Sequence, residues 1–396
     1  MIPYGRQSIN VRDVYEVAKQ LSFRSLTQGN KTLEFEKFAA KYCGAKYAVA
    51  VANATAGLQI AIKSLGLEEN SKVATSPISF VASSNSIIYN NLQPYFVDIE
   101  IKNANISIQN LENELQKGLR ISAVIPVHFA GQSCDMPSLK KLADKYKFKI
   151  IEDAAHALGG NHEDGIKVGS CKYSDLTVFS MHPVKSITSG EGGLITTNDR
   201  DLYYKLLRLR SHGINKLDDE FLNPINSQTD GKTNLWYYEM IQLGYNFRLT
   251  DIQSALALSQ IKRLDKFISK RRKIAHLYFD LLKQNKHLEP LIQLDDIKHS
   301  ALHIFVIKID FTSLNISRNA LMQKLRDQGI GSQVHYIPIP MQPFYKDLGF
   351  ETARYPKAME YYNSALSIPI FPKLNKKSVK KISRVLTEIV KNHSST

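Results

Sequence analysis

The sequence predicts an α/β protein with a large three-layer domain, built on a mainly parallel sheet, and a smaller C-terminal α+β domain. Short apolar, β-branched runs alternate with amphipathic stretches up to about residue 200. Such alternation is typical of a parallel sheet with helices on both faces. A long helical stretch then leads to fewer strands, at 304–309 and 332–337, and to a last helix at 377–391. We therefore expect domains at 1–248 and 249–396.

The elements of the large domain follow one another in a regular order. Residues 11–21 and 32–42 have the apolar spacing of amphipathic helices. Further helices are predicted at 58–65, 77–89 and 202–210, and strands at 47–52, 72–75, 94–98, 123–128, 148–153, 176–179 and 194–197. Residues 211–237 are polar and rich in turn signals, so a long loop is expected there. Beyond it, one long helix is predicted from Thr250 through Leu282, with Thr250 or Asp251 as its cap.

One lysine lies between two of the predicted strands. The segment from 180 to 193 carries Lys185, several hydroxyl groups and three glycines. Glycines let a backbone turn sharply or approach a ligand closely. Desolvation of a lysine amine at such a place lowers its pKa and makes it a nucleophile. The alternative is a solvated lysine in a surface hairpin.

A second stretch favours the nucleophile. The strand at 148–153 ends in two carboxylates, Glu152 and Asp153, and ligands of α/β sheets bind outside the carboxyl ends of the strands. Pyridoxal 5'-phosphate needs a lysine to hold its aldehyde as a Schiff base and an acid to keep its pyridine nitrogen protonated. Lys185 and Asp153 are therefore the predicted catalytic residues, and pyridoxal phosphate is the predicted cofactor.

A strand, three small residues and a helix follow one another at 47–65. Unpaired N–H groups at the start of a helix, together with its dipole, favour an anion there. Thr55 adds a hydroxyl group to this turn. The alternative is that Thr55 only caps the helix, since threonine is a good N-cap residue.

Composition excludes several other classes of protein. No apolar run reaches the roughly 18 residues of a membrane span, and the first residues lack the apolar core of a signal peptide, so the cytoplasm is expected. Cys43, Cys134 and Cys171 are far apart, and no cysteine or histidine spacing indicates a metal site. The formal charge of +15 is spread along the chain, with a concentration only at 262–273. No nucleic-acid-binding motif accompanies it, so a solvated basic surface is expected rather than a nucleic-acid interface.

Four segments carry a resemblance to a known family. They are EDAAHALGG at 152–160, FSMHPVK at 179–185 with GEGG at 190–193, LGYNFRLTDIQSAL at 243–256, and QVHYIPIPMQPFY at 333–345. With the opening IPYGRQSI at 2–9 they span nearly the whole chain. Their order and spacing resemble the DegT/DnrJ/EryC1/StrS family of pyridoxal-phosphate sugar aminotransferases, and most of all its PseC-type enzymes. This implies the PLP-dependent transferase fold, similar to that of aspartate aminotransferase (fold type I).

The resemblance also implies roles for individual residues. It places the cofactor phosphate against Thr55 and Ala56, where Ala54 stands in place of the family's usual glycine. Ser180, five residues before the lysine, matches the serine that binds this phosphate. Asn246 matches an asparagine that reaches the cofactor phosphate of the other subunit, which implies a homodimer with shared active sites. The implied cofactor-binding residues are Thr55, Ala56, Phe80, Asp153, His156, Ser180, Lys185 and Asn246, and the implied substrate contacts are Tyr4, Arg6, His182, His335 and Tyr336.

The implied reaction is the transfer of an amino group, with glutamate as the expected donor, to C4 of a UDP-linked 4-keto-6-deoxy-N-acetylhexosamine, in pseudaminic acid or related surface-glycan biosynthesis. One relative of this family carries histidine in place of the lysine and acts as a dehydratase, so Lys185 favours amino transfer. Three alternatives stay open. They are an aminotransferase for another nucleotide-linked keto-sugar, a non-catalytic sensor that binds cofactor or sugar, and a nucleic-acid-binding protein.

Overall fold

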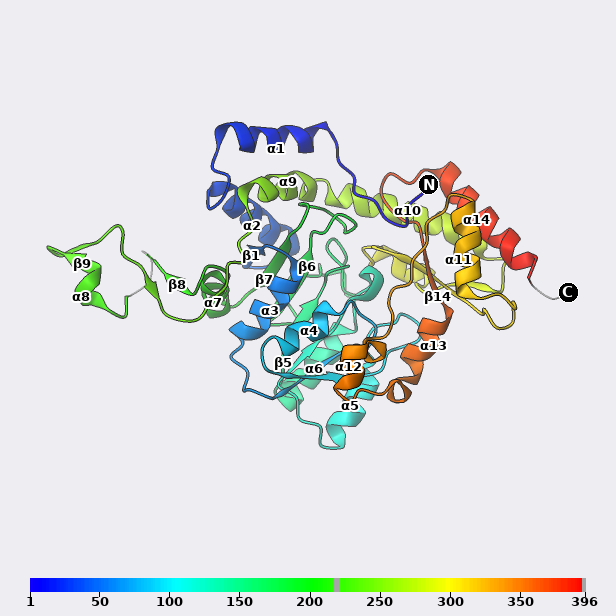
Figure 1. Ribbon diagram of the computed structural model, residues 1–396, viewed down its shortest axis with the longest axis horizontal. Helices are drawn as coiled ribbons and strands as arrows, with labels where there is room; N and C mark the ends of the chain where they lie inside the picture. The colour runs from blue at the N-terminus through cyan, green and yellow to red at the C-terminus, as the bar shows by residue number, and fades with distance from the viewer. Residues whose placement is uncertain (217–220, 394–396) are drawn as a thin grey trace.

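A seven-stranded sheet lies at the centre of the computed structural model, which describes residues 1–216 and 221–393 (Figure 1). The strand order is β1-β7-β6-β5-β4-β2-β3. β7 (Gly193–Thr197) pairs antiparallel with β1 and β6, whereas the other pairs are parallel. This arrangement confirms the α/β class. The other strands are β1 (Tyr47–Val51), β2 (Lys72–Thr75), β3 (Gln93–Phe96), β4 (Ala123–Ile125), β5 (Lys149–Asp153) and β6 (Leu176–Ser180).

Helices cover both faces of this sheet. Successive side chains of a strand point to opposite faces, and β1 illustrates the result. Its Val49 and Val51 belong to one apolar cluster with α3 and α7, while Ala48 and Ala50 belong to another with α2 and α9. The large domain therefore has three layers, with the sheet between two layers of helices. The helices of the large domain are α1 (Val11–Phe23), α2 (Asn30–Cys43), α3 (Ala54–Ser64), α4 (Ala82–Ile88), α5 (Ile108–Gln116), α6 (Met136–Tyr146) and α7 (Arg200–Arg210).

A second, antiparallel sheet of three strands lies in the C-terminal part of the chain. Its strands are β12 (Leu288–Pro290), β13 (Phe305–Ile309) and β14 (Ala365–Ile368), in that order across the sheet. Apolar side chains of α10 (Leu264–Leu282), α11 (Arg318–Asp327) and α14 (Lys376–Lys391) pack against it in one cluster. Two short helices, α12 (Pro343–Asp347) and α13 (Pro356–Ser364), complete this part. The division at 248/249 stays a prediction.

Several predicted boundaries were wrong. The helix expected from Thr250 to Leu282 is two helices, α9 (Asp251–Ile261) and α10, with Thr250 capping the first. The break lies at Arg263, which leaves helical geometry (φ −116°, ψ 6°) where its guanidinium donates to Asp13 of α1 at 2.6 Å.

Residues 332–337, expected as a strand, make only an isolated bridge between Gln333 and Ser367. Residues 333–337 line a cavity instead, and among them His335 is buried. The helix expected from residue 77 begins only at Ala82, so that Phe80 stands before it, and α3 begins four residues earlier than expected.

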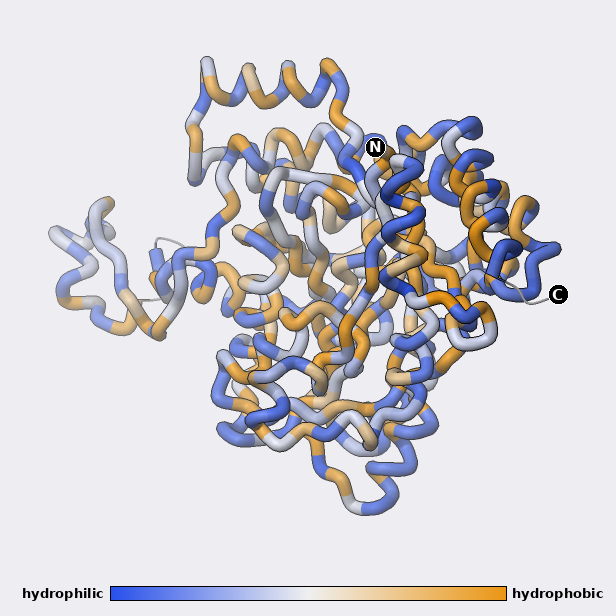
Figure 2. The backbone as a smooth tube through the Cα atoms, turned by 45° about the vertical axis from the view of Figure 1, so that its right-hand side comes forward, coloured by the Kyte–Doolittle hydropathy of each residue, from blue (hydrophilic) through white to orange (hydrophobic). Residues whose placement is uncertain are grey.

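Two parts of the chain lie at the outside of the molecule. α1 lies over α9, and the segment between α7 and α9 projects from one end (Figure 1). Short elements lie in the predicted loop at 211–237 and just beyond it: β8 (Ile214–Asn215), α8 (Pro224–Ser227), β9 (Gln228–Thr229), β10 (Lys232–Thr233) and, after the loop, β11 (Glu239–Met240). Residues 217–220 of that prediction lie outside the described residues. Both parts carry apolar stretches (Figure 2), and their exposed apolar side chains include Val11, Val14, Phe23, Leu235, Trp236 and Leu243.

Among the described residues, no helix combines the length and apolar character needed to cross a membrane. Cys43, Cys134 and Cys171 are free and buried.

Candidate active site

A cavity of about 870 Å³ lies at the carboxyl ends of β5 and β6. A cavity of this size holds a cofactor with part of a substrate. Its walls come from three distant parts of the chain: the N-terminus, the large sheet, and residues 333–342. The predicted residues that line it are Tyr4, Thr55, Phe80, Asp153, His156, Ser180, His182, Lys185, His335 and Tyr336.

Lys185 lies in the turn that follows β6. Its backbone N–H donates to the carbonyl of His182 at 2.9 Å, which fixes the turn. Desolvation lowers the pKa of the Lys185 amine to about 8, although the charge of Asp153 acts in the opposite direction. About one-tenth of amines with this pKa are unprotonated at pH 7, and the unprotonated amine is the form that can react as a nucleophile.

Asp153 is the last residue of β5 and is 5% exposed. Its Oδ1 accepts the backbone N–H of Ala155 at 3.1 Å, and its Oδ2 accepts the hydroxyl of Ser83 at 2.6 Å. Both oxygens are therefore held in place. The preceding carboxylate, Glu152, points to the opposite face, where it contacts Nε2 of His128 at 2.6 Å.

The start of α3 forms one end of the cavity. Asn53 caps this helix, and its side chain accepts the N–H of Ala56 at 2.8 Å. Ala54 and Thr55 line the cavity, and they carry the first N–H groups of the helix, which lack partners within it. β7 approaches closely here. A Cβ at Gly193 would lie 2.6 Å from the carbonyl carbon and oxygen of Asn53, so only glycine fits. Ser180, at the end of β6, completes this end.

Histidines and a tyrosine line another wall. Nε2 of His156 hydrogen-bonds with the hydroxyl of Tyr336 at 3.0 Å, and the ring of His303 lies behind it at 4.4 Å between centroids. Nδ1 of His335 hydrogen-bonds with Ser367 at 2.8 Å. Burial, reinforced by the charge of Lys185, lowers the pKa of His335 to about 3 and that of His156 well below its usual value. These imidazoles are neutral at physiological pH.

Phe80 is 60% exposed at the edge of the cavity. Its ring lies 6.2 Å from the ring of Tyr336, at a tilt of 55°. Tyr4 from the N-terminal segment lies 5.4 Å from the ring of His335. Because Phe80 is so exposed at the mouth of the cavity, one face of its ring is free to cover a planar ligand.

Three predicted residues lie elsewhere. Arg6 is exposed and does not line this cavity. The N–H of Ala56 donates to the side chain of Asn53, and the side chain of Ala56 is buried. Asn246 is exposed and pairs with Ser211 at the base of the projecting segment.

Sequence reasoning missed other residues that surround the cavity. Asn53 carried a signal, because asparagine is a preferred cap. Gln333 and Gln342 lie within the segment 333–345 that carried the family resemblance. Ser83 and His303 carried no signal, since only the fold brings them to this place.

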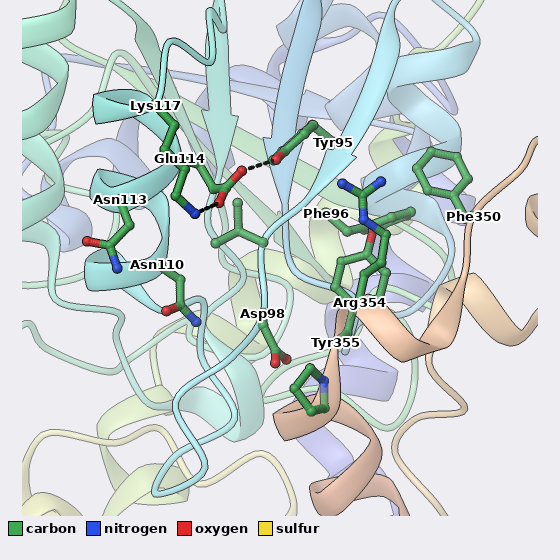
Figure 3. Close-up of a pocket in the computed structure, with 12 residues that line it drawn as sticks. Tyr95, Phe96, Asp98, Asn110, Asn113, Glu114, Lys117, Phe350, Arg354 and Tyr355 are labelled. Atoms are coloured by element: carbon green, nitrogen blue, oxygen red, sulfur yellow. Dashed lines mark hydrogen bonds and ion pairs between the residues drawn. The ribbon is translucent and has the colours of Figure 1, made fainter.

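A second hollow of about 340 Å³ lies between α5 and the segment that leads into α13 (Figure 3). Glu114 accepts hydrogen bonds from the hydroxyl of Tyr95 at 2.8 Å and from Lys117 at 3.0 Å. Arg354 reaches over the opposite side. Lys185 and Asp153 do not line this hollow, and several of its polar groups satisfy one another, so the first cavity is the candidate active site.

Comparison with known proteins gives a consistent result. Residues 7–387 match the model of the DegT/DnrJ/EryC1/StrS aminotransferase family. A UDP-4-amino-4,6-dideoxy-N-acetyl-beta-L-altrosamine transaminase from Campylobacter jejuni is 37% identical over 98% of both chains. The spore coat polysaccharide biosynthesis protein SpsC from Bacillus subtilis is 36% identical over 98% of this chain and 97% of its own.

Among solved structures, the Helicobacter pylori aminotransferase PseC, involved in the biosynthesis of pseudoaminic acid, superposes with a TM-score of 0.88 at 30% identity, over 99% of each chain. The predicted resemblance is thereby confirmed, and with it the transferase fold. The chain belongs to the DegT/DnrJ/EryC1/StrS aminotransferase family.

Proposed function

We propose that this protein is a pyridoxal-phosphate-dependent aminotransferase that moves an amino group from an amino acid to C4 of a UDP-linked 4-keto-6-deoxy-N-acetylhexosamine. The observation that carries the proposal is the meeting of Lys185 and Asp153 in one cavity, with a lysine pKa of about 8. Aminotransferases of this family depend on pyridoxal phosphate.

The residues of the cavity fit this cofactor. Nδ1 of His156 is buried and has no hydrogen-bond partner among the described residues, so a ligand atom is expected to satisfy it. The start of α3 and the hydroxyl of Ser180 suit a phosphate. When bound, the cofactor supplies an aldehyde that condenses with amines and a ring that accepts an electron pair.

Residues of the chain would have separate roles in binding the cofactor and in proton transfer. Lys185 would hold the cofactor and, with a pKa of about 8, would take up and release a proton near neutral pH. Asp153 would keep the pyridine nitrogen protonated. Phe80 would cover the ring. The neutral histidines, His156 and His335, would orient ligands by hydrogen bonds without adding charge to the cavity.

The choice of sugar rests on similarity. Two relatives from Campylobacter jejuni named as UDP-4-amino-4,6-dideoxy-N-acetyl-beta-L-altrosamine transaminases are 37% and 36% identical to this chain. SpsC is equally similar, and this favours a second candidate, an aminotransferase for a different nucleotide-linked keto-sugar. L-glutamate is proposed as the donor, and Tyr4, His182, His335 and Tyr336 as the sugar contacts. The net charge of +15 would help to attract an anionic nucleotide-sugar.

We also propose a cytoplasmic homodimer. The apolar side chains on α1 and on the projecting segment are exposed in the single chain, and such patches mark interaction surfaces. Asn246 lies at the base of the projecting segment, outside its own chain's cavity, which supports a role in the partner's site.

The first experiment is an absorbance spectrum of the purified protein with pyridoxal phosphate, before and after borohydride, followed by peptide mapping. We expect a visible band that reduction fixes to Lys185. Lys185→Ala is the control, and it should fold, carry no trapped cofactor and catalyse no transamination. An unmodified, colourless wild-type protein would favour the sensor hypothesis, and turnover by Lys185→Ala would contradict the central claim.

The sugar is tested separately with a panel of nucleotide-linked keto-sugars, using L-glutamate as the donor. We expect the highest kcat/KM with the UDP-linked 4-keto-6-deoxy-N-acetylhexosamine. A higher value with another nucleotide, or with a 3-keto sugar, would select the second candidate.

A further inference from the structure

A buried hydroxyl group on α4 holds the carboxylate of Asp153. Ser83 is fully buried, and its hydroxyl lies 2.6 Å from Oδ2 of Asp153, 70 residues away in the sequence. Asp153 lines the candidate active site, whereas Ser83 lies behind it and does not line the cavity. The contact therefore acts on Asp153 and not directly on a ligand.

A second hydroxyl continues this contact toward the cavity wall. The oxygens of Ser79 and Ser83 are 2.6 Å apart, and Ser79 is 3% exposed and lines the cavity. A carboxylate only accepts hydrogen bonds, so the single proton of Ser83 goes to Asp153. The hydroxyl of Ser79 has two acceptors in reach, the oxygen of Ser83 at 2.6 Å and the backbone carbonyl of Phe80 at 3.0 Å. When it donates to Ser83, the shorter of the two contacts, a directed chain of hydroxyl groups runs from Ser79 through Ser83 to Asp153.

We propose that Ser83, supported by Ser79, is a positioning residue for Asp153. This rests on the proposed function, in which Asp153 pairs with the pyridine nitrogen of the cofactor. Ala155 and Ser83 together donate to both carboxylate oxygens and so restrain the rotation of the side chain. A donated hydrogen bond also favours the charged form of a carboxylate, and donors in a chain strengthen one another. Both effects keep the proton on the ring nitrogen.

The same segment carries the proposed stacking residue. Phe80 lies between Ser79 and the start of α4, with its ring at the edge of the cavity. The backbone from 79 to 83 would therefore position two contacts of the cofactor at once. These are Phe80, which would cover its ring, and Asp153, which would pair with its nitrogen.

The experiment compares Ser83→Ala with Ser86→Ala as the matched control. Ser86 is also fully buried on α4, but its hydroxyl donates to the backbone carbonyl of Ser83 at 2.9 Å and does not contact Asp153. Each variant is loaded with pyridoxal phosphate, and its visible absorbance is titrated against pH. The rate at which L-glutamate bleaches the visible band is then measured, and thermal unfolding reports the stability of each variant.

We expect Ser83→Ala to bind the cofactor, to shift the pH midpoint of the absorbance change, and to slow the reaction with L-glutamate about tenfold, which is the size of effect of one hydrogen bond to a charged group. Ser86→Ala should lose similar stability yet titrate and react like the wild type. Ser79→Ala should follow Ser83→Ala with a smaller effect.

Equal titration midpoints and rates for Ser83→Ala and Ser86→Ala would overturn the proposal. If Ser83→Ala fails to fold, the same two measurements are made on Ser83→Cys and Ser79→Ala. The cysteine keeps the shape of the side chain but donates only a weak hydrogen bond, so titration midpoints and rates equal to those of Ser86→Ala in both variants would overturn the proposal. A wild-type protein without a band fixed to Lys185 would instead refute the proposed function itself, so the two failures are distinguishable.

Discussion

At the scale of single residues, the chemistry of this site depends on burial more than on charge pairing. Desolvation dominates the lowered pKa of Lys185, and it also dominates the lowered pKa of His335. At pH 7 His335 is neutral, whereas about nine-tenths of the Lys185 amines still carry a proton. Asp153 is the exception, since donors hold both of its oxygens.

The lysine pKa gives a stability prediction for the protein without cofactor. The pKa of Lys185 is about 8 in the folded state, below its ordinary value of 10.5, so the unfolded chain binds more protons between these values. Stability therefore rises with pH across this window, and below it the buried charge destabilises the fold. Lys185→Met should stabilise the cofactor-free protein at pH 7 by on the order of 2–3 kcal/mol.

This gain should shrink by about 1 kcal/mol between pH 7 and pH 9, because the wild-type amine loses its proton there. Denaturant unfolding of both proteins at the two pH values measures it. A gain that does not change with pH would mean that Lys185 is not desolvated in the free protein.

At the scale of elements, the start of α3 combines stability with binding. Asn53 closes the first turn of this helix, and β7 reaches it only because position 193 is glycine. The helix begins at Ala54, four residues before the predicted start. The prediction began too late because asparagine and small residues are typical of loops. The consequence is that Thr55 lies in the first turn and is not the cap.

Asn53→Ala should therefore have two effects. It should lower the free energy of unfolding by about 1 kcal/mol, the usual cost of a lost cap, and it should weaken retention of pyridoxal phosphate. Asn375→Ala is the matched control, because Asn375 caps α14 with the same 2.8 Å contact, to Ser378, far from the cavity. Unfolding curves and equilibrium dialysis of the cofactor measure both effects. Equal cofactor retention in the two variants would show that this turn does not bind the phosphate.

At the scale of the whole molecule, the single chain leaves its projecting segment and α1 with exposed apolar side chains. In the proposed dimer these surfaces would be covered, and Asn246 would serve the neighbouring cavity. A closed, symmetric pair would contain two such shared sites.

Mixed dimers test this arrangement. Lys185→Ala and Asn246→Ala should each impair activity, because each removes one group from every site. A hybrid of the two contains one site with both groups intact. After unfolding and refolding together in equal amounts, about a quarter of the wild-type activity should return. The control refolds each variant alone. If mixtures show no more activity than the separate variants, Asn246 does not act across subunits.

The sequence by itself determined the α/β class, most strands of the large sheet, and the pairing of Lys185 with Asp153 as the candidate chemistry. Each of these depends on a local signal: alternation of apolar residues, or a reactive side chain at the end of a strand. The same kind of signal identified Thr55 and Ser180 once the family resemblance was added.

Only the tertiary structure decided which other groups meet the reactive pair. Glu152 and Asp153 are neighbours in sequence, and β5 sends them to opposite faces because strand side chains alternate. Residues 333–337 have a strand pattern, yet they line the cavity after a single bridge to Ser367. Ser83 and His303 carry no local signal at all, since their partners lie 70 and 147 residues away in the chain. Contacts over such separations arise from the packing of the whole fold, which no local pattern encodes.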